Sequence, residues 1–181
     1  QTLSRLGGSR GAETLIAFGA LAILTCVLFL PALQPGAVFY FRDISQNHHP
    51  YRELTVSMIA AHEAPLWNPA RGAGQPLLAN PNALVLHPTT LLFLVLPVAS
   101  AMKLSVILQV LLAGIATWLL LRDAGVSRAG SLLGAGVFAF SGYMVSLGNL
   151  LNLLDSAAFM PLTLWLAARA VKLRFAPWGS L

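Results

Sequence analysis

Polar side chains suited to catalysis or to ligand binding occur at a few places in an otherwise apolar chain. The first group begins with Asp43 and continues through His48, His49 and Glu53. An aspartate that follows closely on an apolar run can act as a general base toward a hydroxyl group, or it can ligate a divalent cation. The same carboxylate can instead cap the next segment or pair with Arg42 or Arg52. Asp43 is therefore the candidate catalytic residue, with a structural role as the alternative.

His48, His49 and Glu53 are the candidate metal ligands. Positions 49 and 53 are one helical turn apart, so an imidazole nitrogen and a carboxylate can meet on one face of a helix. The three residues match no recognised metal-binding spacing, and a solvated helix start explains them as well. The sequence thus leaves the cofactor open, apart from the divalent cation that Asp43 can hold.

Several arginines, amides and one further aspartate are candidates for substrate binding. A guanidinium group suits phosphate oxygens, so Arg42, Arg52 or Arg71 can hold a phosphate at the level of the lipid headgroups. Ordinary snorkelling to the membrane surface also explains each of them. The full candidate set comprises Arg42, Arg52, Arg71, Asn68, Gln75, Asn152 and Asp155.

Asn152 and Asp155 stand near the start of the last apolar run. A carboxylate close to hydrocarbon is costly unless it faces protein or water. We therefore expect Asp155 to point toward the large loop that follows the first apolar run. There it can line a substrate cavity, or it can clamp helices together through hydrogen bonds.

The composition predicts an integral membrane protein. Hydrophobic residues make up 57% of the 181 residues and charged residues only 9%, whereas about a quarter of a soluble domain is charged. The net charge is +5, but the Lys and Arg residues are scattered singly, which argues against a nucleic-acid partner. One cysteine, Cys26, allows no intrachain disulfide. Membrane lipid is the expected surrounding.

Four apolar runs are long enough to cross a bilayer, and they cover residues 14–33, 101–121, 129–148 and 153–171. A helix of 20 residues reaches about 30 Å, the thickness of the hydrocarbon core. The first run exceeds the apolar core of a cleaved signal peptide, so we expect an uncleaved anchor. A small-residue face on the third run predicts close helix packing, and its members are Gly130, Gly134, Gly136 and Ala139.

Residues 34–100 form one large loop between the first two spans. Tyr51, Leu54 and Met58 recur at helical spacing and predict an amphipathic helix over residues 50–63 that lies along the membrane. The apolar segment 84–97 reaches only about 21 Å as a helix and cannot span. We interpret it as an interfacial or re-entrant helix.

Positive charges predict the orientation, because cytoplasmic loops carry an excess of Lys and Arg. Four spans place seven basic residues on the inner side: Arg5, Arg10, Arg122, Arg128, Arg169, Lys172 and Arg174. Only four lie outside: Arg42, Arg52, Arg71 and Lys103. We therefore expect an all-α, multi-pass protein of the cell membrane, with residues 1–181 in one membrane domain, the amino terminus in the cytoplasm and the loop outside.

Several short motifs resemble the first outer loop of bacterial YfhO-like membrane proteins. They are Phe41-Arg-Asp43, Pro50, Ala64-Pro-Leu-Trp-Asn-Pro69, Gly72-Ala-Gly-Gln-Pro-Leu-Leu-Ala-Asn-Pro81 and His87-Pro88. Phe140-Ser-Gly-Tyr-Met-Val-Ser146, Gly148 and Pro161 resemble the next helices of the same family. The resemblance covers residues 38–172, and the Pro-Leu-Trp-Asn-Pro core is its most specific part.

The YfhO-like family is similar to the C-type glycosyltransferase fold, in which membrane helices support catalysis at the outer face with polyprenyl-phosphate sugar donors. The resemblance implies that Asp43 matches the catalytic carboxylate of the first outer loop. It also implies a lipid-linked sugar donor and an acceptor in the cell envelope. Both ends of the chain have the character of truncation points, so we expect the chain to be the amino-terminal part of such a fold. The alternative is a membrane protein without enzymatic activity, either a transporter or an envelope-assembly scaffold.

Overall fold

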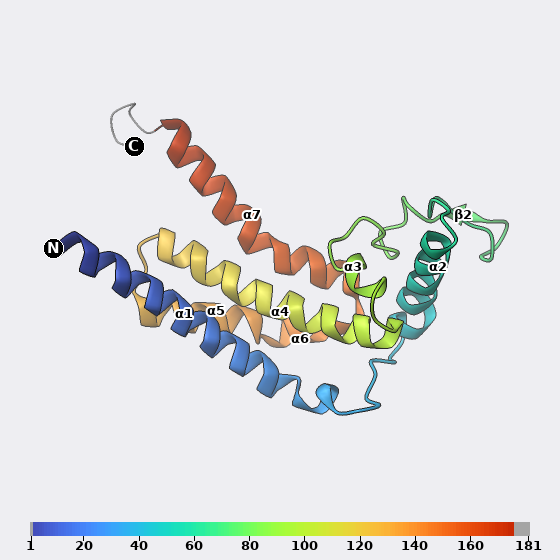
Figure 1. Cartoon of the computed structure of the whole chain (residues 1–181), viewed down its shortest axis with the longest axis horizontal. Coiled ribbons are helices and arrows are strands. Elements are labelled where there is room, and N and C mark those ends of the chain that lie inside the picture. The colour runs from blue at the N-terminus through green and yellow to red at the C-terminus, as the bar shows by residue number, and fades with distance from the viewer. Residues whose placement is uncertain (1, 176–181) are drawn as a thin grey trace. The chain divides into compact units, whose positions relative to one another are not determined.

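The computed structural model describes the backbone of residues 2–175 and the side chains of residues 11–172. The side chains of Arg5, Arg10 and Arg174, which the sequence places on the inner side, lie outside the described residues. The protein is 69% helical. Its elements are α1 (Thr2–Leu28), η1 (Leu30–Leu33), η2 (Ile44–His48), α2 (His49–Ala60), β1 (Trp67–Asn68), β2 (Gln75–Pro76), α3 (Thr90–Phe93), α4 (Val98–Asp123), α5 (Arg128–Ala139), α6 (Gly142–Ser146), η3 (Leu147–Asn149) and α7 (Leu151–Phe175) (Figure 1).

Four helical segments are long and apolar enough to cross a membrane, as the sequence predicts. They are Gly11–Leu28, Val98–Asp123, Arg128–Asn149 and Leu151–Lys172. Many of their large apolar side chains face outward: Leu15, Ile23 and Val27 of α1 are more than 60% exposed. Such a surface is stable in hydrocarbon and unfavourable in water. The chain is therefore an all-α, multi-pass membrane protein.

The third span is interrupted, although the sequence predicts one continuous helix over residues 129–148. The helix α5 ends at Ala139, and α6 begins at Gly142. The hydroxyl of Ser141 explains the interruption, because it accepts a hydrogen bond from the backbone N–H of Met144 over 3.2 Å. A serine in this position offers the backbone an alternative to the helical ladder and starts a new helix.

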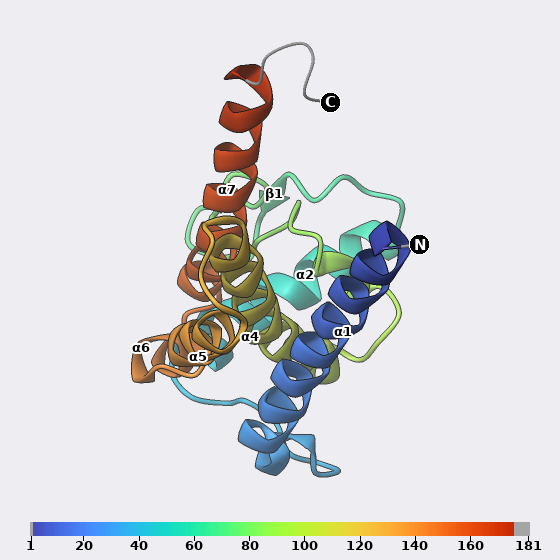
Figure 2. The same ribbon diagram turned by 90° about the vertical axis from the view of Figure 1, so that its left-hand side faces the viewer.

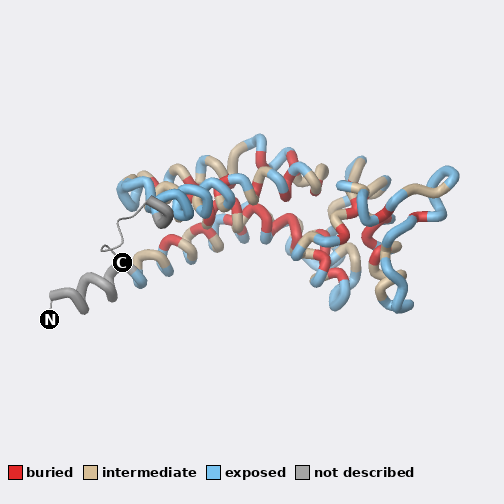
Figure 3. The backbone as a smooth tube through the Cα atoms, turned by 90° about the horizontal axis from the view of Figure 1, so that it is seen from above, coloured by how far each residue is buried: buried red, intermediate tan, exposed pale blue. Residues whose placement is uncertain are grey.

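The described chain divides into two compact units. We call residues 2–28, 109–145 and 156–175 the bundle unit, and residues 29–108 and 146–155 the loop unit. The helices α4 and α7 each contribute to both. Figure 3 shows buried residues in several separate stretches of the chain, among many exposed and intermediate ones.

The bundle unit is held together by small and aromatic side chains. Ala17, Leu21, Trp118 and Ala135 form its buried cluster. The rings of Phe18 and Trp118 meet edge to face, with centroids 5.6 Å apart, and α1, α4 and α5 run side by side (Figures 1 and 2). Gly114 lies so close to α5 that an added Cβ would be 3.3 Å from the Cβ of Ala139. The predicted small-residue packing of α5 therefore includes Ala139, whereas Gly136 meets only Phe140 of its own segment, at 3.9 Å.

Basic residues gather at one end of the bundle unit. Arg128, at the start of α5, pairs with Glu13 of α1 at 2.6 Å. At the end of α4, the carboxylate of Asp123 accepts a hydrogen bond from Trp165 over 2.8 Å, and the Asp123 carbonyl accepts one from Lys172 over 3.0 Å. Glu13 of α1, the α4–α5 turn and the Lys172 end of α7 thus lie at one end of the bundle unit.

The loop unit combines α2 with a small hairpin. Tyr51, Leu77, Ala83 and Val85 form its buried cluster. The strands β1 and β2 pair antiparallel, with Trp67 opposite Pro76 and Asn68 opposite Gln75. The helix α2 occupies most of the predicted segment 50–63, and the Gly- and Pro-rich stretch after it contains the hairpin of β1 and β2.

The interfacial helix predicted over residues 84–97 is not formed. Turns follow one another there, and the only helix is α3, with four residues. Leu84 has a φ of +49°, and Pro88 and Pro97 cannot donate backbone hydrogen bonds. An unbroken helix across this segment is therefore excluded.

Candidate functional site

Asp43 stands where the sequence places a catalytic carboxylate, after the first span and directly before the π-helix η2. It is half-buried, and its Oδ1 accepts a hydrogen bond from Nδ2 of Asn47 over 2.8 Å. Among the described residues, neither alternative role is present: Asp43 does not cap η2 with its side chain and forms no ion pair with Arg42 or Arg52. Its carboxylate is thus held by one amide and can still accept a proton.

A cavity of about 140 Å³ opens beside the turn that carries Asp43. Its apolar wall comes from Val38, Phe39, Tyr40 and Ile44, and its polar groups come from Ser45 and His49. Ala99 of α4 closes it. The π-helical turn Ile44–His48 is wider than an α-helical turn, a geometry that is frequent at functional sites. The cavity has room for part of a small polar group next to an aromatic wall.

His48 is not available as a metal ligand. Only 1% of it is exposed, its Nδ1 lies 3.0 Å from the carbonyl oxygen of Asn82, and its Nε2 accepts the backbone N–H of Leu151 over 3.2 Å. A carbonyl can only accept and an N–H can only donate, so the ring is neutral with its proton on Nδ1. Burial lowers the pKa of His48, and the charge of Arg52 lowers it further, while the Asn82 bond and Asp43 oppose the shift.

His49 and Glu53 contact each other instead, at 3.6 Å on the exposed side of α2. His48 and His49 are successive helical residues, so their side chains leave the helix about 100° apart. Within residues 11–172, no three His, Cys, Asp or Glu side chains are grouped to hold a metal ion. The predicted metal set of His48, His49 and Glu53 is therefore wrong as a cluster.

Arg52 is buried rather than placed at the membrane surface, with only 1% of it exposed. Its Nη1 donates to the carbonyl of Leu84 over 3.0 Å and to Oγ1 of Thr90 over 2.6 Å. The guanidinium lies 4.5 Å from the ring centroid of Phe93. Burial lowers the pKa of Arg52 to about 10, against the opposing influence of Asp155, so the group stays charged at neutral pH. Arg52 therefore ties α2 to the segment before α4 and is not open to a phosphate.

Asp155 points toward the loop, as the sequence predicts. It is buried, and its Oδ2 lies 3.6 Å from Nε2 of His87. The backbone N–H of Thr89 donates to Nδ1 of His87 over 3.3 Å, so the ring proton stands on Nε2 and faces the carboxylate. Burial and the charge of Arg52 both lower the pKa of His87. Of the two roles open for Asp155, the geometry matches the clamp, here between α7 and the loop. Asn152, predicted beside it, is half-buried one turn earlier in α7.

The remaining predicted substrate residues support the hairpin. Arg71 and Gln75 both donate hydrogen bonds to the hydroxyl of Tyr51, over 2.5 and 2.9 Å. Oδ1 of Asn68 accepts the backbone N–H of Ala70 over 2.9 Å. Tyr51 therefore organises two of the predicted residues. The sequence showed it only as one apolar position of an amphipathic helix.

Arg42 is exposed and directly precedes Asp43, whereas Arg52 is buried and Arg71, although exposed, donates a hydrogen bond to Tyr51. The φ of Arg42, +44°, is unusual for a residue with a side chain. No sequence pattern predicts this backbone conformation. Arg42 is thus the exposed loop arginine next to the candidate carboxylate in the chain, and it is the one best placed to bind a ligand.

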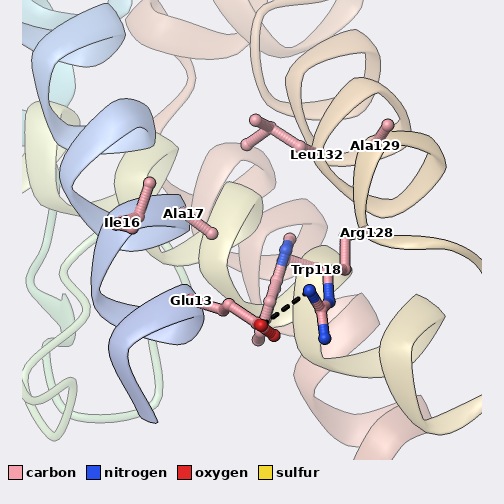
Figure 4. A pocket seen from close by; sticks show the side chains of 7 residues that line it. All are labelled: Glu13, Ile16, Ala17, Trp118, Arg128, Ala129 and Leu132. Atoms are coloured by element: carbon pink, nitrogen blue, oxygen red, sulfur yellow. Dashed lines mark ion pairs between the residues drawn. The ribbon is translucent and has the colours of Figure 1, made fainter. Parts of the chain in front are cut away.

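A second cavity, of about 190 Å³, lies in the bundle unit between α1 and α5 (Figure 4). Ile16, Ala17, Trp118 and Leu132 give it apolar walls, and the Glu13–Arg128 ion pair lies at one side of it. It holds no nucleophile and only this one charged pair among its lining residues. Packing between helices explains it, and it was not predicted from the sequence.

The fold and the buried polar cluster define a polytopic α-helical membrane protein with an ordered, polar loop. Charge interactions in this loop connect residues that are far apart in the chain: Asp43, His48, Arg52, His87 and Asp155. No protein-family model, curated protein or solved structure matches the chain. The resemblance to the YfhO-like family therefore stays a prediction that rests on the motifs quoted for it.

Proposed function

We propose that this protein is a membrane glycosyltransferase, or the amino-terminal part of one. It would transfer a sugar from a polyprenyl-phosphate carrier to a cell-envelope acceptor on the outer side of the cell membrane. The observation that carries this proposal is the state of Asp43, a half-buried carboxylate with one amide partner that directly precedes Ile44 and Ser45, two residues that line a small cavity. Such a carboxylate can take the proton of an acceptor hydroxyl. The family resemblance supports the same residue.

The proposed orientation has the amino terminus in the cytoplasm. It is supported by the basic end of the bundle unit, where Arg128, Arg169 and Lys172 lie near Glu13 and Asp123. Cytoplasmic segments are enriched in such residues. In a Cys26→Ala background, Gln46→Cys should react with an impermeant maleimide from outside intact cells, and Ala124→Cys should not. Both positions are exposed. The reverse labelling pattern would invert the topology.

Arg42 is the proposed phosphate ligand. It is exposed and adjacent to Asp43, whereas Arg52 is buried against Phe93 and Arg71 is bound to Tyr51. A guanidinium beside the base can neutralise the leaving phosphate as the bond to the sugar breaks. Arg52 acts on the same unit through its charge, which lowers the pKa of His48 and of His87.

The test of the proposed activity is the pair Asp43→Asn and Glu53→Gln, in the intact protein with a lipid-linked sugar donor. Loss of a general base reduces the rate by roughly 10²–10⁴-fold, so Asp43→Asn should remove transfer. Glu53 is an exposed carboxylate ten residues away on α2 and pairs only with His49, so Glu53→Gln should keep it. Transfer by correctly inserted Asp43→Asn at the unmodified rate refutes the proposed role.

A protein without enzymatic activity, a scaffold or a transporter, is the second candidate. It is favoured by the number of loop residues that serve structure, among them Arg52, Asn68 and Gln75. A scaffold needs an ordered outer surface and no open carboxylate. Binding of a lipid-linked sugar that weakens in Arg42→Ala favours the transferase, and the absence of any such binding favours the scaffold.

A further inference from the structure

Two short segments of the loop unit expose large apolar side chains. In the first, which follows η1, Val38, Tyr40 and Phe41 are 55%, 77% and 67% exposed. In the second, which precedes α4, Leu86, Leu91 and Val95 are 84%, 69% and 78% exposed. Side chains of this size and exposure are unfavourable in water, and together they form more than scattered surface apolar residues.

The second segment is held rigidly with its apolar side chains outward. Thr90 and Phe93 are buried, and Arg52 both bonds to the Thr90 hydroxyl and stacks on the Phe93 ring. Leu91 lies in α3 and Val95 in the turn that follows it, and both side chains are exposed whereas Thr90 and Phe93 are buried. Because Arg52 holds Thr90 and Phe93 on the inner side of this segment, the side chains of Leu91 and Val95 remain on its outer side.

Both segments adjoin the first turns of α4, a helix that can span a membrane from Val98 onward. Nζ of Lys103 donates to the carbonyl of Ala37 over 3.0 Å, and Ala99 closes the cavity that Val38 and Tyr40 line. Only Leu96 and Pro97 separate Val95 from α4, and three residue steps span at most about 11 Å. The exposed side chains therefore lie near the level at which α4 enters the bilayer.

The charge pattern fits hydrocarbon as the partner. Residues 72–102 contain no Asp, Glu, Lys or Arg, and neither do residues 37–41. A protein partner in water is commonly recognised through an apolar centre with a polar rim. Here the rim is uncharged on the side that leads into α4, and Tyr40 has the amphipathic ring typical of the membrane interface.

We infer that these two segments are membrane anchors, in which Tyr40 and Phe41 on one side and Leu86, Leu91 and Val95 on the other insert among lipid acyl chains. The partner is the leaflet that α4 enters first. The anchors hold the loop unit against the membrane, and they place Asp43, two residues after Phe41, at headgroup depth. Contact of Asp43 with a lipid-linked phosphate rests on the proposed function, whereas insertion does not.

The test measures the surroundings of single spin labels in the intact protein, in vesicles of phosphatidylethanolamine and phosphatidylglycerol. In a Cys26→Ala background, cysteines replace Tyr40, Leu91 or Val95. Ser57→Cys, on the exposed face of α2, is the aqueous control, and Leu133→Cys, 70% exposed on α5 within a candidate span, is the lipid control. Every substituted side chain points away from the packed interior, so the fold should be retained.

Labels at Leu91 and Val95 should collide with oxygen severalfold more than with a water-soluble nickel complex, as the Leu133 label does, and Tyr40 should be intermediate. A collision ratio like that of Ser57 overturns the inference. Protection from both reagents also overturns it, because it would show that protein covers the segment. Adding Asp43→Asn should leave these ratios unchanged. Insertion without sugar transfer would therefore remove the proposed function and leave the anchors intact.

Discussion

His48 and Leu151 are joined by a hydrogen bond across 103 positions of the chain, from the backbone N–H at the start of α7 to Nε2 of the ring, over 3.2 Å. The other ring nitrogen contacts the carbonyl of Asn82 at 3.0 Å. One neutral imidazole thus satisfies two backbone groups from two distant segments. The loop unit depends on this residue for its closure.

Replacing His48 with alanine should destabilise the loop unit by about 2–4 kcal/mol, because the buried N–H of Leu151 loses its partner at a cost of about 1–3 kcal/mol and the part-buried carbonyl of Asn82 loses its partner at a smaller cost. The free energy of unfolding in mixed micelles measures the effect. His49→Ala is the matched control, since its pair with Glu53 is partly exposed and should be worth less than about 1 kcal/mol. Equal losses from both substitutions would contradict the role of His48.

Acid should weaken the protein through His48 and His87. Burial lowers the pKa of both from 6.5, so the open state binds protons more readily than the closed one. Their contribution to stability is complete above about pH 6.5 and is lost as the pH falls from there toward the lowered pKa values. The midpoint of thermal unfolding between pH 8 and pH 5 should decrease, with a smaller decrease in His48→Ala. An unchanged slope in the double variant with His87→Ala would refute this origin.

Removing the buried charge of Arg52 should be among the most harmful single changes in the loop. Arg52→Met leaves the Leu84 carbonyl without its guanidinium donor and leaves Asp155 without a nearby positive charge, at a cost of about 3–5 kcal/mol. Arg52→Lys should rescue little, because an ammonium lacks the planar face that the guanidinium presents to the Phe93 ring. Arg42→Ala should change the stability by no more than about 0.5 kcal/mol, while it reduces phosphate binding if the proposed function is correct.

Gly74 should be less tolerant of substitution than Gly72. Both have a positive φ, so alanine at either position costs about 1–2 kcal/mol in backbone strain. At Gly74 the added Cβ would also lie 2.5 Å from Nε1 of Trp67, whereas nothing lies within 4 Å at Gly72. Gly74→Ala should therefore displace the indole and shift Trp67 fluorescence, and Gly72→Ala should not. The same spectrum in both variants would contradict the packing of Trp67.

Gly114 and Gly136 offer the same comparison for helix packing. Alanine in a helix interior is favoured over glycine by about 0.5–1 kcal/mol, and Gly136→Ala should show this gain because its nearest neighbour is 3.9 Å away. Gly114→Ala should instead lower the stability, because the Cβ of Ala139 at 3.3 Å cannot rotate away. Unfolding in mixed micelles distinguishes the two, and a gain from both would show that α4 and α5 separate easily.

The membrane character and the four spans were predictable from the chain alone. Length and hydropathy are local properties, and a run of about 20 apolar residues crosses hydrocarbon whatever lies beside it. The position of Asp43 after the first span and the inward direction of Asp155 followed from the same local reasoning. The interruption at Ser141 was missed, because a serine inside an apolar run can face out or cap a new helix, and hydropathy does not distinguish the two.

The roles of the loop side chains depended on contacts between distant segments. Arg52 resembles any membrane-surface arginine until Leu84, Thr90 and Phe93 surround it. His48 resembles a metal ligand until Asn82 and Leu151 occupy its two nitrogens. Local sequence patterns indicate whether a segment prefers lipid or water. The hydrogen bonds and the burial of a side chain depend instead on its neighbours in the folded protein. In this loop those neighbours lie more than thirty positions apart in the chain.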